Sequence, residues 1–264
     1  MFSPNSFQAN MAGKAARMVV VSALLVATLS GCAETAVELI TDDTLLLNKA
    51  NNFYSRLRYN QASEAYRKVM DEYPDSKYRK AAVIGLADSL YKEGQFDESN
   101  LYYERFVEMY PMDDMTPRAL FYFGMSHMML TSTADRSQKK THMARKVFEE
   151  FVIRYPDNAL APTAAIYKER MENMLAQSKL EVARFYFRTN KNAAAIGRLT
   201  EFIEKNPKSS DIPEAMFILG QSYMREQSYR KAAEVFTILI GNHPKSEWAA
   251  KAQETASNLV VKSN

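Results

Sequence analysis

The sequence contains a single cysteine, Cys32, among its 264 residues. One thiol cannot form an intrachain disulfide, and it cannot by itself supply a cysteine-based metal site. Long apolar runs are also missing: the apolar segment at 18–28 has about 11 residues, whereas a membrane-spanning helix needs roughly 20. We therefore expect no cystines, no cysteine-bound metal and no transmembrane helix.

Histidines and catalytic motifs are equally scarce. The three histidines, His127, His142 and His243, form no HExxH pattern, and we expect each at the surface or in a turn. No glycine-rich phosphate-binding loop and no G-x-S-x-G motif occurs. Adjacent carboxylates, such as the pair at 113–114, are expected on loops or helix faces in contact with water. The sequence therefore gives no support for acid–base catalysis. We expect no catalytic residues, no metal and no enzyme; a hydrolase using scattered carboxylates is the alternative from another class.

The N-terminal region has the features of a secreted lipoprotein. Lys14 and Arg17 precede the apolar segment, and no acidic residue occurs before Glu34. A short apolar core behind a basic stretch is typical of a secretory signal peptide. The Leu-Ser-Gly-Cys run that ends at Cys32 resembles the bacterial lipobox, in which small residues admit a peptidase and the cysteine takes a lipid. A plain secretory signal, or a buried cysteine at a domain edge, is the alternative.

We therefore expect residues 1–31 to be a lipoprotein signal peptide and residues 32–43 to be a lipidated flexible linker. Cys32 would carry N-acyl and S-diacylglycerol lipid and no other cofactor, and several acyl chains anchor a protein far more firmly than one. Ala33, in place of aspartate after the cysteine, favours the outer membrane. Removal of the signal peptide lowers the net charge from +3 to +1, which does not favour nucleic-acid binding.

The body of the chain is repetitive. Five amphipathic segments end in a proline, and each has a small residue 12 positions before the proline and large apolar residues 8 and 5 positions before it. These offsets place the three residues on one face of a helix. Proline ends each helix because it cannot continue it. The five prolines are Pro74, Pro111, Pro156, Pro207 and Pro244.

Another helix precedes each of these segments, and the pair resembles the tetratricopeptide repeat, a helix–turn–helix of about 34 residues. We predict an all-α fold, a right-handed tetratricopeptide-repeat superhelix of about five helix pairs. The third unit carries an insertion at 131–141, and the fourth begins with an extended helix from Pro162 to about Arg188. We expect Trp248, the only tryptophan, to cover the end of the array.

Stacked helix pairs form a concave face lined by their first helices. In the first three units, the positions predicted to face outward carry aromatic, methionine and polar side chains, which suit a groove for an extended or aromatic-ended peptide. The candidate groove residues are Leu47, Asn51, Tyr54, Ile84, Asp88, Tyr91, Phe121, Met125 and Met128. The alternative is that flanking elements or the N-terminal linker cover this face.

The middle of the chain carries a more specific resemblance. It contains an Asp-Arg-Ser triplet at 135–137, an A-R-x-x-F-x-x-F run at 144–151, an R-M-x-x-M-L-A run at 170–176 and an A-A-x-x-R-L run at 194–199. Together with the lipobox and the repeats, these segments resemble the BamD (ComL/YfiO) family, lipoproteins of the outer-membrane β-barrel assembly machinery (BAM complex). The resemblance covers nearly the whole mature chain and is most specific in its middle.

The resemblance implies a scaffold on the periplasmic face of the cell outer membrane. Repeats in residues 44–155 would bind targeting segments of unfolded outer-membrane β-barrel proteins, and repeats in residues 156–264 would bind the periplasmic domains of BamA, with other BAM lipoproteins as further partners. Arg198 matches a family arginine on the BamA side, where a bidentate pair with a carboxylate fits; an ordinary surface arginine is the alternative. The usual family segment Y-P-F-G-P-Y reads Y-P-D-S-K-Y at 73–78, which puts the N-terminal pocket in doubt.

The alternative function is that of a different repeat lipoprotein scaffold, for pilus or secretin assembly or for the coordination of peptidoglycan enzymes. Both interpretations describe a non-enzymatic binding protein. They differ in the partner that the chain captures: BamA in the first, and a secretin or a peptidoglycan synthase in the second.

Overall fold

The computed structural model describes residues 41–131 and 138–262, with side chains up to residue 257. The chain separates into two units, 1–42 and 43–264, and nearly all described residues belong to the second. Cys32 and the triplet at 135–137 lie outside the described residues. No helix in the described ranges is long and apolar enough to cross a bilayer.

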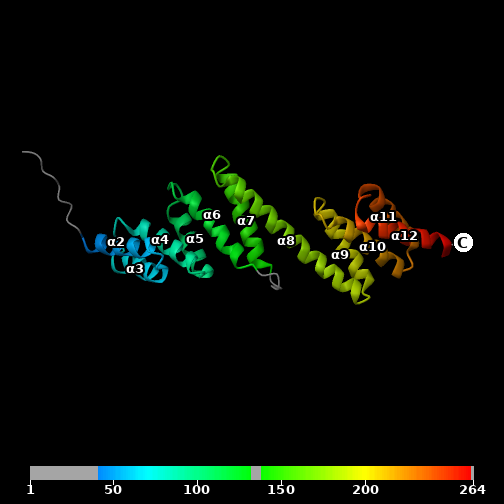
Figure 1. Ribbon diagram of the computed structural model, residues 1–264, viewed down its shortest axis with the longest axis horizontal. Helices are drawn as coiled ribbons and strands as arrows, with labels where there is room; N and C mark the ends of the chain where they lie inside the picture. Colours follow the sequence, from blue (N-terminus) through cyan, green and yellow to red (C-terminus); the bar gives the residue numbers. More distant parts are fainter. Residues whose placement is uncertain (1–40, 132–137, 263–264) are drawn as a thin grey trace, which may run out of the picture. The chain divides into compact units, whose positions relative to one another are not determined.

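All regular structure in these ranges is α-helical, as predicted (Figure 1). The helices are α2 (Asp42–Ser55), α3 (Tyr59–Glu72), α4 (Arg79–Lys92), α5 (Phe96–Met109), α6 (Thr116–Met129), α7 (Lys139–Arg154), α8 (Ala161–Arg188), α9 (Asn192–Lys205), α10 (Ile212–Arg225), α11 (Tyr229–Asn242) and α12 (Glu247–Lys262). From α3 onward each helix packs against the next one, and α12 packs on both α10 and α11. The predicted array of five helix pairs is therefore confirmed, with α12 as an additional last helix.

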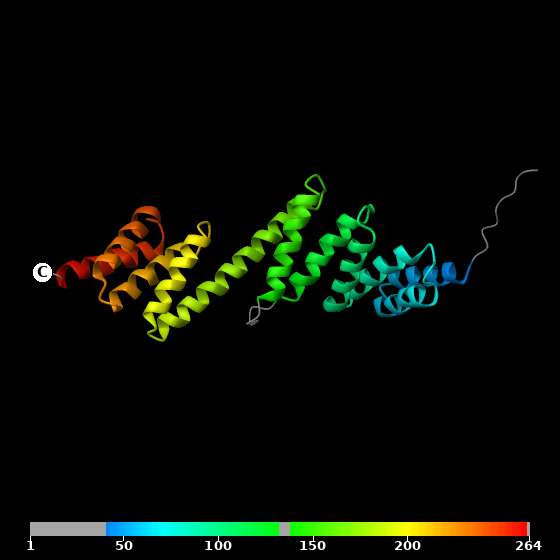
Figure 2. The same cartoon turned by 180° about the vertical axis from the view of Figure 1, so that it is seen from behind.

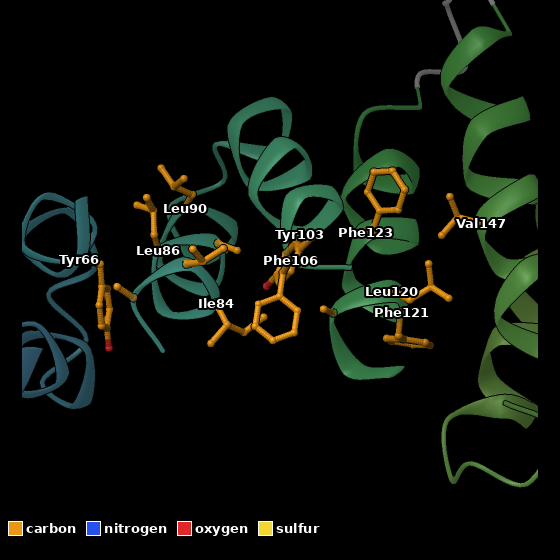
Figure 3. Packing of buried hydrophobic residues seen from close by; sticks show 14 of the residues in the cluster. Tyr66, Ile84, Leu86, Leu90, Tyr103, Phe106, Leu120, Phe121, Phe123 and Val147 are labelled. Carbon is orange, nitrogen blue, oxygen red and sulfur yellow. The ribbon is translucent and has the colours of Figure 1, made fainter. Parts of the chain in front are cut away.

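The residues that define the repeat are buried as the spacing predicts. The small residues Ala62, Ser99, Ala144, Ala195 and Ala232 are fully buried, and so are the rings of Tyr103, Phe148 and Phe236 that follow them. Figure 3 shows such side chains stacked between successive helices of the first three units. Close approach also depends on Gly124: a Cβ atom there would lie 2.8 Å from Cε1 of Phe148, closer than side-chain carbons approach.

The turn after each second helix is the same in all five units. The residue two places after the proline donates its N–H to the carbonyl just before the proline over 3.0–3.1 Å, and its own carbonyl accepts an N–H three residues later. This position is always a short polar residue, whose side chain accepts a nearby backbone N–H. Such residues favour turns because they offer the backbone this local partner. The five residues are Ser76, Asp113, Asn158, Ser209 and Ser246.

A second recurring turn joins the two helices within a pair. Leu57, Gly94, Asn190 and Gln227 occupy it with φ values of 57–79°. The following residue donates its N–H to the carbonyl five positions back, as in a Schellman motif, for example from Gln95 to Leu90 over 2.9 Å. Glycine tolerates this left-handed conformation, whereas other L-residues cost about 1–2 kcal/mol there.

The long helix α8 takes part in two hydrophobic cores. The N-terminal core runs from Leu47 to Met171 and the C-terminal core from Ala176 to Ala252. Both views show α8 reaching from α7 to α9 (Figure 1 and Figure 2). The predicted extended helix is confirmed. Trp248 packs in the C-terminal core at 5.4 Å from the ring of Phe217, as expected for a residue at the end of the array.

The insertion predicted at 131–141 is shorter than expected. Helix α7 begins at Lys139, so residues 139–141 form its first turn, and residues 132–137 lie outside the described ranges. Thr141 is buried in this turn. Residues 138–141 are all polar, so no apolar period in the sequence marks this helix start.

We predict that Leu57→Gly stabilises the fold. Leu57 has a positive φ and is 69% exposed, so glycine removes backbone strain while little apolar burial is lost. The free energy of unfolding in urea should rise by about 0.5–1 kcal/mol. Gly94→Leu is the matched control and should lower it, because Gly94 occupies the same turn of the next unit. A destabilised Leu57→Gly protein contradicts the prediction.

Candidate interaction surfaces

Three of the nine candidate groove residues do not face outward. Leu47, Ile84 and Phe121 are buried in the N-terminal core, so the expectation that they line the groove is wrong. Figure 3 shows Ile84 and Phe121 among the packed side chains. Phe121, for example, contacts Phe148 and Phe151 on α7 and also Tyr167 on α8, so the following unit buries a second face of α6 that the repeat spacing does not reveal. The remaining six are exposed or partly exposed, on α2, α4 and α6: Asn51, Tyr54, Asp88, Tyr91, Met125 and Met128.

Asp88 is the centre of a polar cluster between α4, α5 and α6. Its carboxylate accepts the hydroxyl hydrogen of Tyr103 over 2.6 Å and pairs with the guanidinium of Arg118 over 2.9 Å. The Arg118 guanidinium also lies 5.0 Å from the ring centroid of Tyr122. Burial and the Asp88 charge raise the pKa of Tyr103. Burial acts to lower the pKa of Arg118, but Asp88 raises it overall, so both groups keep their protons.

Aromatic rings surround this cluster. Tyr91 meets the edge of Tyr122 at 5.2 Å, and burial followed by the charge of Asp88 raises the pKa of Tyr54. The negative charge of Asp88 on α4 therefore disfavours ionisation of Tyr54 on α2. Among the described residues, Nη1 of Arg118 is buried and has no hydrogen-bond partner. The arrangement can stack an aromatic group and donate an N–H to an anion. We call Asn51, Tyr54, Asp88, Tyr91, Met125 and Met128, with Arg118 and Tyr122, the aromatic face.

Arg198 lies on a different surface, on α9. It is 57% exposed, and its Nη1 is 3.8 Å from Glu201, a carboxylate that Lys205 holds more closely at 2.8 Å. Lys205 first, and Arg198 to a smaller degree, lower the pKa of Glu201. The arginine lines a hollow of about 190 Å³ with Lys179, Val182, Glu201 and Phe202. The side chain is therefore only loosely paired and can reach another carboxylate.

His127 differs from its expected place at the surface. It is 5% exposed, its ring lies 4.9 Å from that of Phe123, and neither ring nitrogen has a partner among the described residues. Burial first, and then the charge of Lys140, lowers its pKa to about 4, against the opposing effect of Asp97. His127 follows Phe123 by four positions, so the helical spacing contained the signal for burial. His142 is exposed, as expected.

A comparison with protein families shows to which family this chain belongs. A model described as YfiO, outer membrane lipoprotein, matches residues 41–225, and a tetratricopeptide repeat model matches residues 214–246. The chain belongs to the YfiO family of outer membrane lipoproteins. The first match covers the aromatic face and Arg198 alike, so both surfaces lie within the family region.

Similar curated proteins carry one name. The chain is 24% identical over 241 residues to the outer membrane protein assembly factor BamD of Rickettsia prowazekii, covering 90% of this chain and 96% of that protein. It is 23% identical to BamD of Neisseria gonorrhoeae, covering 78% and 81%. Among solved structures, the TPR2AB-domain:pHSP90-complex of yeast Sti1 matches with 16% identity and a TM-score of 0.44, covering 83% and 84%.

We predict that His127 makes the fold less stable in mild acid. The unfolded chain takes up a proton near pH 6.5, whereas the folded chain holds His127 neutral down to about pH 4. Between these values the unfolded state binds more protons, so the free energy of unfolding falls as the pH falls, by on the order of 2–3 kcal/mol. His127→Leu should flatten this dependence in urea titrations, while His142→Leu should keep it. Equal slopes for wild type and His127→Leu contradict the prediction.

Proposed function

We propose that this protein is an outer-membrane lipoprotein scaffold of the β-barrel assembly machinery. It binds BamA through one surface and segments of unfolded outer-membrane proteins through another, and it promotes their folding and insertion. The family match over residues 41–225, together with relatives named outer membrane protein assembly factor, is the observation that carries the proposal. Binding, rather than chemistry, is the function.

The aromatic face supports the role in binding unfolded chains. Its carboxylate, Asp88, already holds Tyr103 and Arg118, so the face does not offer a free anion. What it offers is the unpaired N–H of Arg118 beside the rings of Tyr91 and Tyr122 and the thioether of Met125. An aromatic residue with a neighbouring carboxylate fits this set, since rings stack on rings and a charged acceptor satisfies the buried donor.

The surface around Arg198 supports the contact with BamA. Its guanidinium has only a long contact to Glu201, at 3.8 Å. An arginine held this loosely keeps its planar donors for a bidentate pair with a partner's carboxylate. Glu201 and Lys205 satisfy each other, so the partner would not compete with an existing strong pair of Arg198.

A lipid at Cys32 would complete the mechanism. Tethering at the membrane raises the effective concentration of every further contact, so single contacts with a client chain can stay weak. Weak contacts suit a scaffold that must release each client. Tyr54, Tyr91 and Met125 of the aromatic face pack against the N-terminal core, whereas Arg198 lies on α9, which contributes to the C-terminal core. The two binding roles therefore use different surfaces.

We expect Arg198→Glu and Tyr91→Ala to separate the two binding roles. Arg198→Glu should lower recovery of BamA in pull-downs from membrane extract at least tenfold and leave crosslinking to unfolded barrel proteins unchanged, because it reverses the charge of one surface only. Tyr91→Ala should lower crosslinking to unfolded barrel proteins and leave recovery of BamA unchanged. Arg230→Glu, at an exposed arginine of α11, is the matched charge control. Circular dichroism checks that each variant is folded.

Two outcomes overturn the proposal. Recovery of a pilus secretin or a peptidoglycan synthase in place of BamA supports a different scaffold. Unchanged recovery of BamA with Arg198→Glu at matched expression removes Arg198 from the interface.

We also expect Cys32→Ser to abolish membrane anchoring. Serine cannot form the thioether to diacylglycerol, so the precursor should stay unprocessed or leave the outer-membrane fraction. Density-gradient fractionation with an antibody to the chain measures this. Normal processing and normal fractionation of Cys32→Ser would rule out lipid attachment at this residue.

A further inference from the structure

The first unit leaves open a side that other units bury. In the second, third and fifth units, the first helix packs on the second helix of the unit before it. The position directly before the small residue of that first helix is apolar in these units and no more than 8% exposed: Leu86, Phe123 and Leu219. In the first unit the same position is Lys49, which is exposed. Figure 1 shows its helix, α2, beside α3 at the start of the array.

Apolar and basic side chains meet on this open side. The centroid of the Phe53 ring lies 5.9 Å from Nζ of Lys49 and 5.0 Å from Cζ of Arg58. Leu45 precedes Lys49 by four positions, so it lies one turn away on the same side of α2, and it is 54% exposed. The two cations therefore adjoin an apolar patch that remains partly exposed.

A hollow of about 200 Å³ extends this patch from α2 onto α3. Leu46 and Lys49 line it from α2, and Glu64 and Lys68 line it from α3; Glu64 is the one carboxylate among its lining residues. In the described part of the chain, Lys49, Arg58 and Lys68 form no ion pair with a carboxylate. Their charges are therefore available to an external anion. We call this surface the basic end face; its residues are Leu45, Leu46, Lys49, Phe53, Arg58 and Lys68.

We propose that the basic end face binds the bilayer surface, with its cations on the phosphate groups of anionic phospholipids. The inference rests on the lipid at Cys32 that the proposed function includes. Lysine and arginine close to a bilayer are attracted to anionic headgroups, and neighbouring apolar side chains enter the boundary between headgroups and acyl chains. Leu45 and Phe53 supply the apolar part, and the long basic side chains carry their charges past it toward the phosphates.

Two observations favour a lipid surface over a further protein helix as the occupant. Residues 33–41 separate Cys32 from α2, and a segment of this length spans at most about 30 Å. A lipid at Cys32 thus keeps α2 close to the bilayer, where even weak contacts are made. A stacked helix, in contrast, would bury the unpaired ammonium group of Lys49 at the position where Leu86 packs in the next unit, and burial of a charge without a partner is costly.

Vesicle flotation tests the proposal with residues 33–264, which lack the signal peptide and the lipid attachment site. They contain the whole of the compact unit 43–264, so the fold is expected to persist. This protein should bind vesicles of phosphatidylcholine that contain phosphatidylglycerol, and it should bind pure phosphatidylcholine at least about tenfold more weakly. Added salt should weaken the binding, because it screens the charges. Lys49→Glu combined with Lys68→Glu should lower the affinity for the anionic vesicles at least about tenfold.

Lys208→Glu combined with Lys245→Glu is the matched control. It changes the net charge equally, at two exposed lysines of the C-terminal units, and should leave vesicle binding unchanged. Circular dichroism checks that both double variants are folded.

Three outcomes overturn the proposal: equal binding to both kinds of vesicle, equal affinity of the Lys49 and Lys68 variant and the unsubstituted protein, or an equal loss with the control pair. Lower recovery of BamA by the Lys49 and Lys68 variant with unchanged vesicle binding overturns it as well, because the face would then contact a protein. The vesicles contain no BamA, so failure here is distinct from failure of the pull-down with Arg198→Glu.

Discussion

The contact between a large ring on one helix and a small residue on its neighbour governs the spacing of this array. Phe148 packs on Gly124 and Tyr66 on Gly85, where an added Cβ atom would lie 2.8 Å and 2.5 Å from the respective ring. Protein interiors are close-packed, and forcing extra atoms into them typically costs about 1–3 kcal/mol. The helices approach on the side of the small residues.

The same contact explains which parts of the fold follow from the sequence. The small and large apolar residues at fixed distances before each proline pack within one helix pair. The paired helices, the extended helix α8 and the buried rings could therefore all be predicted. The burial of Phe121 could not, because part of it arises from contact with Tyr167 of the following unit. Helix α4 has an unbroken buried run from Ala82 to Ala87, and a helix buried on most sides has no single periodic face to read.

The candidate site shows a further limit of sequence patterns. The repeat frame placed Asp88 on the outward side, and the structure leaves it partly accessible. Its chemistry, however, is set by Tyr103 and Arg118, which are 15 and 30 residues away in the sequence. Asp88 does not offer a free negative charge, because it neutralises Arg118 and accepts a hydrogen bond from Tyr103. The charge of Asp88 is thus satisfied within the protein, and no local sequence motif indicates this.

Helix α8 determines how the two surfaces can influence each other. It contributes Met171 to the N-terminal core and Ala176 to the C-terminal core, with Met174 and Leu175 at the junction. The sequence there, Glu-Asn-Met-Leu-Ala-Gln, contains mostly strong helix formers, so the junction is held helical by propensity as well as by packing. A continuous helix resists local melting but bends gently over its length. A client bound at the aromatic face can therefore influence Arg198 through α8 only if this helix bends or shifts. Unfolding of either core is not required.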